Sequence, residues 1–142
     1  MNKLLFATAL LFASTSFADQ LHNYDQVKSA VVAGKSIRIF IDFSKCATSS
    51  KNAHMPSYLG LYSPNEIAIN DDAGYIAASL LHFTLNNPAF PSKPVYEFTR
   101  YTISNDNTVV MSDTPLNAGD FKPLNEKLTF TCKLDESARI YV

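Results

Sequence analysis

Cysteine, histidine and carboxylate side chains are the groups in this 142-residue chain that could do chemistry, and the cysteines are the simplest to interpret. The chain has two of them, Cys46 and Cys132. An even count favours a disulfide in an oxidising compartment. Their wide spacing argues against a C-x-x-C redox site and against zinc, which needs clustered ligands. The alternative is that Cys46 is a nucleophile served by nearby His54. We favour the disulfide, because Cys132 gives Cys46 a partner.

The spacing of the three histidines predicts no metal site. His22, His54 and His82 show neither H-x-x-x-H nor H-x-H spacing, and no carboxylate falls at a ligand offset from them. His82 lies among apolar residues, where a histidine is typically a hydrogen-bonded packing residue. The pair Asp71-Asp72 is followed by no further EF-hand ligands, so it indicates a turn. We therefore expect no metal ion and no cofactor.

A hydrolase remains an open alternative, because side chains that are distant in sequence can meet in space. The candidates are Asp42, Glu97, His82 and His54. This interpretation requires at least two of them within hydrogen-bond reach, about 2.6 to 3.2 Å, in one cleft. The chain contains no G-x-S-x-G, P-loop or G-x-G-x-x-G motif. We accordingly expect a protein that is not an enzyme.

One short helix is expected near the start of the mature chain, over residues 23–33. Apolar residues recur there at helical spacing. Asn23 is a suitable N-cap, with Gln26 completing a capping box, and Gly34 follows where a left-handed C-cap would fall.

About seven strands are expected after the helix. Residues 36–43 and 127–134 alternate cleanly between apolar and polar side chains, as half-buried strands do. Residues 75–85 are apolar on both faces, which predicts a buried strand, whereas 45–56 predicts a loop and 114–125 an irregular segment. The remaining expected strands are 58–62 with 66–70 after a break at Ser63-Pro64, the hairpin of 95–104 and 108–112, and 138–142.

These elements predict an α+β fold that is mostly antiparallel β, with the N-terminal helix against a curled or barrel-like sheet. Cys46 follows the first strand and Cys132 lies on the penultimate one. The disulfide would tie these two strands together and close the sheet on itself, which protects its edges.

The first 18 residues are expected to be a secretory signal peptide. Lys3 precedes about ten apolar residues, and small side chains at Ser16 and Ala18 place cleavage before Asp19. The apolar run is too short to span a bilayer. We expect residues 19–142 to form one domain that is periplasmic or secreted, with no membrane insertion after cleavage. Its slight excess of acidic residues gives no electrostatic basis for binding nucleic acid.

Three stretches of the sequence together resemble the VirK family of small exported bacterial proteins. They are Tyr24-Asp25-Gln26-Val27 leading to Gly34-Lys35, Ile39-Phe40-Ile41-Asp42-Phe43-Ser44-Lys45-Cys46, and Phe130-Thr131-Cys132. The resemblance spans essentially the whole mature chain and implies an association with bacterial virulence. It matches Cys46 and Cys132 as the family's cysteine pair and marks Asp42 and Lys45 as family-pattern residues. It brings no set of catalytic residues.

Three functions follow from these observations, in order of preference. The first is a non-enzymatic exported accessory protein that binds an envelope or host protein partner. The second is a carrier of a small ligand, because five tyrosines recur through the expected strands and could line a cavity; core or surface positions are the ordinary alternative for them. The third is the hydrolase built from the carboxylates and histidines named above.

Overall fold

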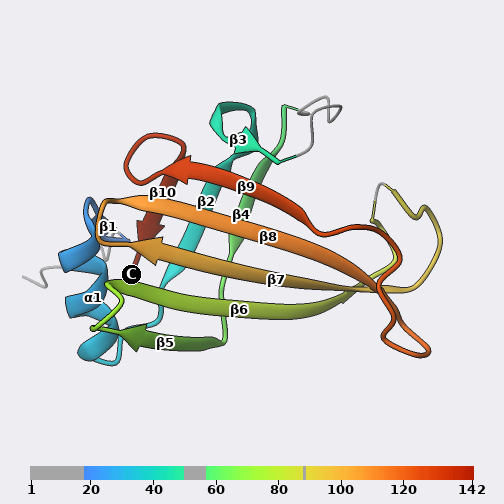
Figure 1. Cartoon of the computed structure of the whole chain (residues 1–142), viewed down its shortest axis with the longest axis horizontal. Helices are drawn as coiled ribbons and strands as arrows, with labels where there is room; N and C mark the ends of the chain where they lie inside the picture. The colour runs from blue at the N-terminus through green and yellow to red at the C-terminus, as the bar shows by residue number, and fades with distance from the viewer. Residues whose placement is uncertain (1–17, 50–56, 88) are drawn as a thin grey trace, which may run out of the picture.

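A computed structural model describes residues 18–49, 57–87 and 89–142. Two antiparallel sheets lie face to face, with one helix at one end of the molecule (Figure 1). His54 and residues 1–17 of the expected signal peptide lie outside the described residues. Within the described ranges, no helix has the length and apolar content needed to cross a bilayer.

The two sheets differ in size. The small sheet has the order β1-β10-β2-β4, with bounds Gln20–Leu21, Ala138–Tyr141, Arg38–Asp42 and Leu59–Tyr62. The large sheet has the order β3-β9-β8-β7-β6-β5, with bounds Ala47–Thr48, Leu128–Lys133, Thr108–Asn117, Val95–Ser104, Tyr75–Thr84 and Glu66–Asn70. Figure 1 shows the strands of the large sheet crossing in front of those of the small sheet.

The predicted helix is confirmed as α1 (Tyr24–Val32). The side chain of Asn23 accepts a hydrogen bond from the Gln26 amide at 3.0 Å, as an N-cap should. In a capping box the Gln26 side chain would accept from the amide of the N-cap residue, Asn23. Here it accepts instead from the amide of His22, one residue earlier, at 2.7 Å. At the other end, Gly34 takes φ +75 and Lys35 donates to the Ala30 carbonyl at 3.0 Å, which is the Schellman pattern.

The core lies between the inward faces of the two sheets. The alternation predicted over residues 36–43 is confirmed, since Ile39 and Ile41 of β2 and Ile37 just before it are each at most 1% exposed. They belong to one hydrophobic cluster with side chains from the large sheet, among them Ile103 and Val109, and with Val27 of α1. The helix therefore closes one end of the space between the sheets.

The disulfide between Cys46 and Cys132 is present. Cys46 follows the short 3-10 turn Phe43–Lys45 that leads out of β2, and Cys132 lies on β9. β2 belongs to the small sheet and β9 to the large one. Cys46 lies where the chain passes from β2 of the small sheet to β3 of the large one, so the bond fastens this crossing point to β9.

The curled or barrel-like single sheet is not confirmed, because the described strands form two sheets that do not close into a barrel. The coarser prediction of a mostly antiparallel β protein with one helix is confirmed. The chain passes between sheets because the turn after β2 carries it to β3, which pairs with β9. β3 lies in the region predicted as a loop.

Two other expectations are wrong in part. The segment predicted to be irregular from residue 114 continues as β8 to Asn117, through Pro115. β9 pairs with β8 only as far as Asp113, so Pro115 sits where its missing N–H breaks no ladder bond on that side. β6 is not buried on both faces, because Leu81 is 45% exposed and Phe83 is 52% exposed.

Candidate functional site

A group of polar side chains occupies the inward face of the large sheet, at the end away from α1. Strand alternation points Glu97, Thr99 and Tyr101 of β7 to the same face as the core residue Ile103. The strand register then places His82 opposite Glu97 and Asp113 opposite Thr99. We call the following set the inward polar cluster: His82, Asn87, Glu97, Thr99, Tyr101 and Asp113.

Glu97 is the best-partnered member of the inward polar cluster. Its Oε2 lies 3.0 Å from Nε2 of His82, and its Oε1 accepts a hydrogen bond from Nδ2 of Asn87 at 2.8 Å. Asn87 is only 7% exposed. His82 Nδ1 is buried without a hydrogen-bond partner among the described residues. The imidazole is therefore held by a carboxylate on one nitrogen only.

Asp113 is the least-partnered carboxylate of the cluster. Its Oδ1 is buried and accepts no hydrogen bond, and it forms no ion pair, within the part of the chain that the structure describes. Burial, and to a smaller extent the Glu97 carboxylate, raise the pKa of Asp113 to about 6, against the opposing effect of a backbone hydrogen bond at Thr114. The fold thus keeps two carboxyl groups close together on one face.

Two tyrosines from opposite sheets adjoin these carboxyl groups. The rings of Tyr62 on β4 and Tyr101 on β7 lie 5.7 Å apart, centroid to centroid. Tyr101 is 1% exposed, and its hydroxyl makes no hydrogen bond of regular geometry among the described residues, although the neighbouring Thr99 side chain lowers its pKa in part. Burial raises the pKa of both phenols, and the charge of Asp113 contributes to the rise in each.

A hollow of about 590 Å³ opens beside Asp113. Asn87 and Asp113 line it together with the apolar side chains of Ala89, Pro115 and Leu128. Lys127 and Glu126 also line it, so its charged groups include one ammonium and two carboxyl groups.

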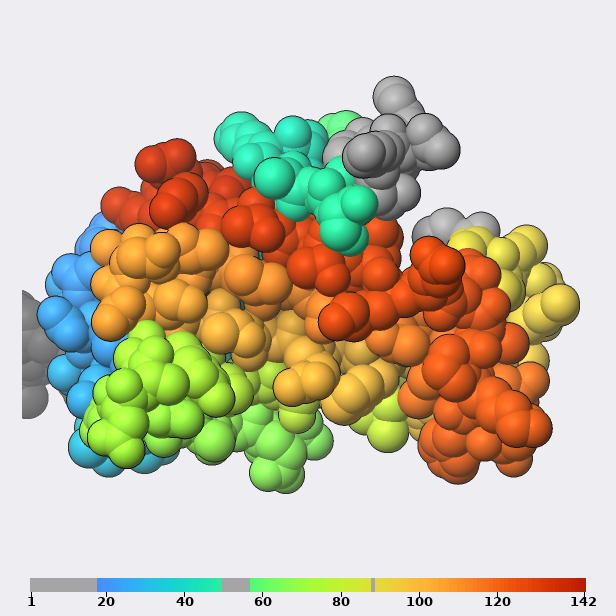
Figure 2. Space-filling model, viewed as in Figure 1, coloured from blue at the N-terminus to red at the C-terminus, as the bar shows by residue number. Residues whose placement is uncertain are grey.

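The outward face of the large sheet carries exposed apolar side chains. Phe83 and Tyr96 are directly paired in the register, with ring centroids 5.5 Å apart, and Phe121 stacks on Tyr96 at 5.2 Å. We call the following residues the outer aromatic patch: Leu81, Phe83, Tyr96, Phe98, Leu116 and Phe121. Figure 2 views this face, with the orange segment that follows β8 standing at its end.

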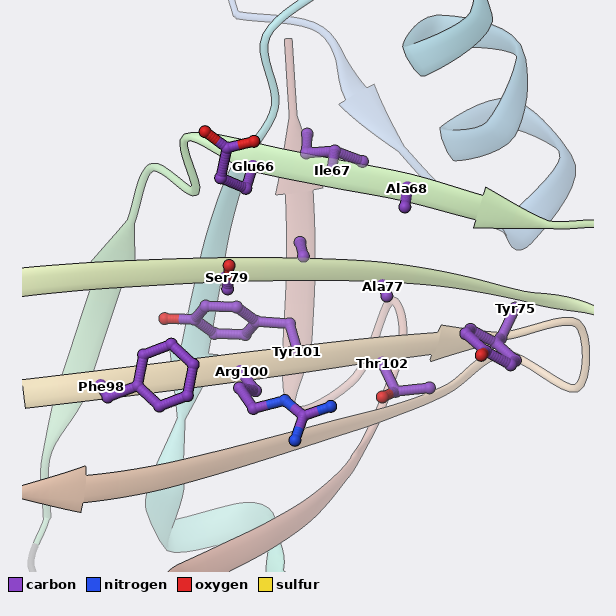
Figure 3. A pocket seen from close by; sticks show the side chains of 11 residues that line it. Glu66, Ile67, Ala68, Tyr75, Ala77, Ser79, Phe98, Arg100, Tyr101 and Thr102 are labelled. Atoms are coloured by element: carbon purple, nitrogen blue, oxygen red, sulfur yellow. The ribbon is translucent and has the colours of Figure 1, made fainter. Parts of the chain in front are cut away.

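A shallow hollow of about 600 Å³ adjoins the outer aromatic patch on the same face and shares Phe98 with it. The small side chains of Ala77 and Ser79 form the bottom of this hollow. Figure 3 shows the larger side chains of Phe98 and Arg100 beside it. Arg100 forms no ion pair among the described residues. The outer face therefore combines apolar rings with an unpaired cation.

Comparison with known proteins identifies the family. The family model of the VirK protein matches residues 20–121, which is more than half of the chain. The chain belongs to the VirK family. The resemblance seen in the sequence is thereby confirmed.

A solved structure of a family member has the same fold. The crystal structure of a VirK family protein from Legionella pneumophila matches with a TM-score of 0.78 at 23% identity, covering 87% of this chain and 98% of the other. A comparison with curated proteins gives no match. The family model therefore establishes membership of the VirK family, and the structural comparison shows that a solved family member has a similar fold.

The VirK-pattern residues Asp42 and Lys45 lie apart from the inward polar cluster, where β2 leaves the small sheet. Lys45 Nζ is 3.0 Å from Asp42 Oδ2, and Ser44 Oγ donates to Asp42 Oδ1 at 2.6 Å. The Ser44 hydrogen bond and then Lys45 lower the pKa of the Asp42 carboxyl. These contacts span the 3-10 turn just before Cys46, so we interpret Asp42 and Lys45 as residues that shape the approach to the disulfide.

The structure brings together only part of the set considered for a hydrolase. His82 and Glu97 meet the distance condition at 3.0 Å, whereas Asp42 lies on the other sheet and His54 lies outside the described residues. No hydroxyl or thiol is hydrogen-bonded to His82 among the described residues, and Cys46 is in the disulfide. A triad would need such a nucleophile. In the same ranges, no three His, Cys, Asp or Glu side chains are grouped so as to hold a metal ion.

Asp113 and Asn87 were missed by the sequence analysis. Asn87 lies just beyond the strand predicted for residues 75–85, and Asp113 lies one residue beyond the strand predicted for residues 108–112. The alternation of side chains along a strand could have identified Asp113. It follows Met111 by two residues, so an extended strand turns both side chains to the same inward face. A charged residue at an inward position of an alternating strand marks a site that packing alone does not explain.

The raised pKa of Asp113 predicts how stability depends on pH. The folded protein holds this proton up to about pH 6, whereas the ordinary carboxyl value is 3.8, so ionisation of Asp113 destabilises the fold as pH rises between these values. Asp113→Asn is expected to raise the free energy of unfolding by about 1–2 kcal/mol at pH 7.5 and by nothing below about pH 4. Urea unfolding of both proteins at pH 3.5, 5 and 7.5 measures the difference. An equal difference at every pH would contradict the assignment.

Proposed function

We propose that this VirK family member is an exported, non-enzymatic accessory protein that binds a protein partner through the outward face of its large sheet. The observation that carries the proposal is the outer aromatic patch. Soluble monomers rarely leave contiguous large apolar side chains in water unless they form an interaction site. Here Phe98 is 37% exposed, Phe83 52% and Phe121 55%, on one face.

Export is supported by the N-terminal sequence and by the disulfide. Residues 1–18 have the charged start, apolar run and small-residue exit of a secretory signal. Structural disulfides persist in oxidising compartments and are rare in the cytosol. The bond between Cys46 and Cys132 joins two buried side chains, as a structural disulfide does.

The chemistry of the outward face indicates what the partner presents. The aromatic rings favour apolar side chains, because burying them removes apolar area from water. Arg100, which is exposed and forms no ion pair among the described residues, favours a carboxylate beside them. We infer that the partner contributes a segment with apolar residues next to an acidic one.

Photo-crosslinking in the producing cell tests this proposal. A benzophenone amino acid at Phe98 is expected to give one discrete adduct with another protein in the periplasmic or secreted fraction. The intact mass of the unmodified protein in that fraction should correspond to a chain that begins at Asp19. The same benzophenone at Phe40, on the outward face of the small sheet, should give no such adduct.

Competition distinguishes specific docking from general stickiness. Excess unlabelled protein should abolish the adduct, whereas the Phe83→Ser/Phe98→Ser variant should not. The matched control is Leu59→Ser/Leu61→Ser, which removes two side chains that are each 60% exposed on β4 and should compete like wild type. Equal competition by both variants, or an adduct only with a second copy of this chain, would rule out the proposed interface.

A further inference from the structure

The shallow hollow on the outward face of the large sheet is open to solvent and is lined by two opposite charges. We call it the outer hollow. Its volume of about 600 Å³ falls within the range of about 300–1,000 Å³ that small-molecule sites have. Glu66 of β5 and Arg100 of β7 both line it, and both residues are exposed. A ligand in solution can therefore reach both charged groups.

The strand register fixes how these two charges are arranged. Glu66 is paired with Ser79 of β6, and Ser79 is paired with Arg100, so the three residues form one row across the sheet. Directly paired residues point to the same face, and adjacent strands lie about 4.8 Å apart. The Cα atoms of Glu66 and Arg100 are therefore about 10 Å apart. Figure 3 shows the small side chain of Ser79 on the strand between them.

Neither charge is engaged by another side chain. Glu66 and Arg100 form no ion pair, with each other or with a third group, among the described residues. A ligand that enters the outer hollow can thus contact both charges without breaking an existing ion pair.

The other side chains around the outer hollow offer apolar contact and hydroxyl groups. Phe98 and Thr102 lie two residues on either side of Arg100 along β7, so all three point to the same face. The ring of Phe98 is 37% exposed and can pack against an apolar side chain. The hydroxyl groups of Ser79 and Thr102 can exchange hydrogen bonds with a peptide group, and the small side chain of Ala77 leaves room for it.

We propose that the outer hollow binds a short peptide of two or three residues in its zwitterionic form. Arg100 donates hydrogen bonds to the terminal carboxylate, and Glu66 accepts hydrogen bonds from the terminal ammonium group. An extended peptide of this size spans about 7–11 Å, which matches the separation of the two charged residues. The side chain of the carboxyl-terminal residue lies next to Phe98, because Phe98 neighbours Arg100 on β7. The site shares Phe98 and Arg100 with the interface proposed above, but a free peptide needs no protein partner to bind there.

Ligands with a single charge fit the outer hollow less well. An anion would pair with Arg100 but would be repelled by Glu66, and a cation would be repelled by Arg100. A free amino acid carries both of its charges on one carbon atom, so it cannot reach both ends of a row about 10 Å long. A divalent metal ion needs several convergent ligands, and no three His, Cys, Asp or Glu side chains of the described residues are grouped to provide them.

An NMR titration of the purified, oxidised protein with alanyl-phenylalanine tests the proposal. Saturable shifts are expected at the amides of Ser79, Arg100 and Thr102, at constant ionic strength and near neutral pH. N-acetyl-alanyl-phenylalanine lacks the ammonium group, and alanyl-phenylalanine amide lacks the carboxylate. Each should bind about fivefold more weakly than the free dipeptide, which is the upper end of what an exposed ion pair contributes.

Charge variants of the protein give the matched comparison. Glu66→Gln and Arg100→Gln should each weaken binding of the dipeptide about fivefold. Glu126→Gln and Arg38→Gln remove exposed charges that do not line the outer hollow, and they should bind within about twofold of wild type. Ser79→Leu keeps both charges but fills the space between them, so it should weaken binding at least about fivefold.

The dispersion of the spectra reports that each variant is folded. Absence of saturable shifts, equal binding of either capped dipeptide, or unchanged binding by folded Glu66→Gln or Arg100→Gln would each overturn the proposal. Equal binding of the capped forms would show that the outer hollow recognises only the apolar side chain.

Discussion

Replacing both cysteines with alanine is expected to lower the free energy of unfolding by about 4–5 kcal/mol, on the chain-entropy account of crosslinks. The bond joins residues that are 86 positions apart, so its loss frees most of the chain in the unfolded state. It also removes the covalent link between β9 and the turn that leaves β2. The loss is comparable to the whole stability of a marginal domain, so Cys46→Ala/Cys132→Ala is expected to be partly unfolded at 37 °C.

Urea unfolding measures this loss, and the slope of the transition reports its origin. An unfolded chain without the crosslink exposes more surface, so the m-value should rise together with the fall in the midpoint. Asp42→Ala is the matched control at the same turn: it removes the exposed contacts to Ser44 and Lys45 and leaves the bond in place. A double cysteine variant that loses less than about 1 kcal/mol would show that the sheets hold together without the bond.

Local patterns in the sequence predicted the elements of the fold well. Alternation on Ile37, Ile39 and Ile41 identified the inward face of β2, because a strand turns every second side chain to the same side. The turn residues 105–107 placed the β7–β8 hairpin, in which Asn107 takes φ +62. These features depend on a few neighbouring residues, so they can be read from the chain directly.

Strand order could not be read in the same way. β10 pairs with both β1 and β2, which brings Ile140 beside Leu21 and Ile39. Nothing local to residues 138–142 specifies these partners, because any half-buried strand of similar length offers the same ladder bonds. The division into two sheets depends on such distant pairings, which is why the predicted curled or barrel-like sheet is not confirmed in this detail.

The candidate functional surfaces were likewise predictable only in part: their individual residues could be identified from the sequence, but the contacts between strands could not. His82 and Glu97 were recognised individually, but their contact depends on the register of β6 with β7 across the proline-rich loop. The exposure of Phe83 was also missed, because an apolar run reads as buried whichever face is covered. Knowing which face of β6 meets the small sheet was necessary to distinguish the inward polar cluster from the outer aromatic patch.

Substituting Ile39 with alanine is expected to cost about 2–5 kcal/mol of unfolding free energy. Ile39 is 0% exposed and lies on β2 between Ile140 of β10 and Tyr62 of β4. Its side chain belongs to the cluster that joins the small sheet to the large one. Truncation leaves a cavity in the middle of this contact, where the strands on both sides are held by their own ladders and cannot collapse to fill it.

The neighbouring residue gives the control for this substitution. Phe40 is larger than Ile39, but alternation turns it to the outward face, where Arg139 lies 5.2 Å from its ring centroid. Phe40→Ala should therefore cost about 1 kcal/mol or less. Urea unfolding of the two variants compares one-residue neighbours on opposite faces of one strand. If Phe40→Ala proved the more destabilising, the inward face assigned to β2 would be wrong, and the packing of the two sheets would have to be reassigned with it.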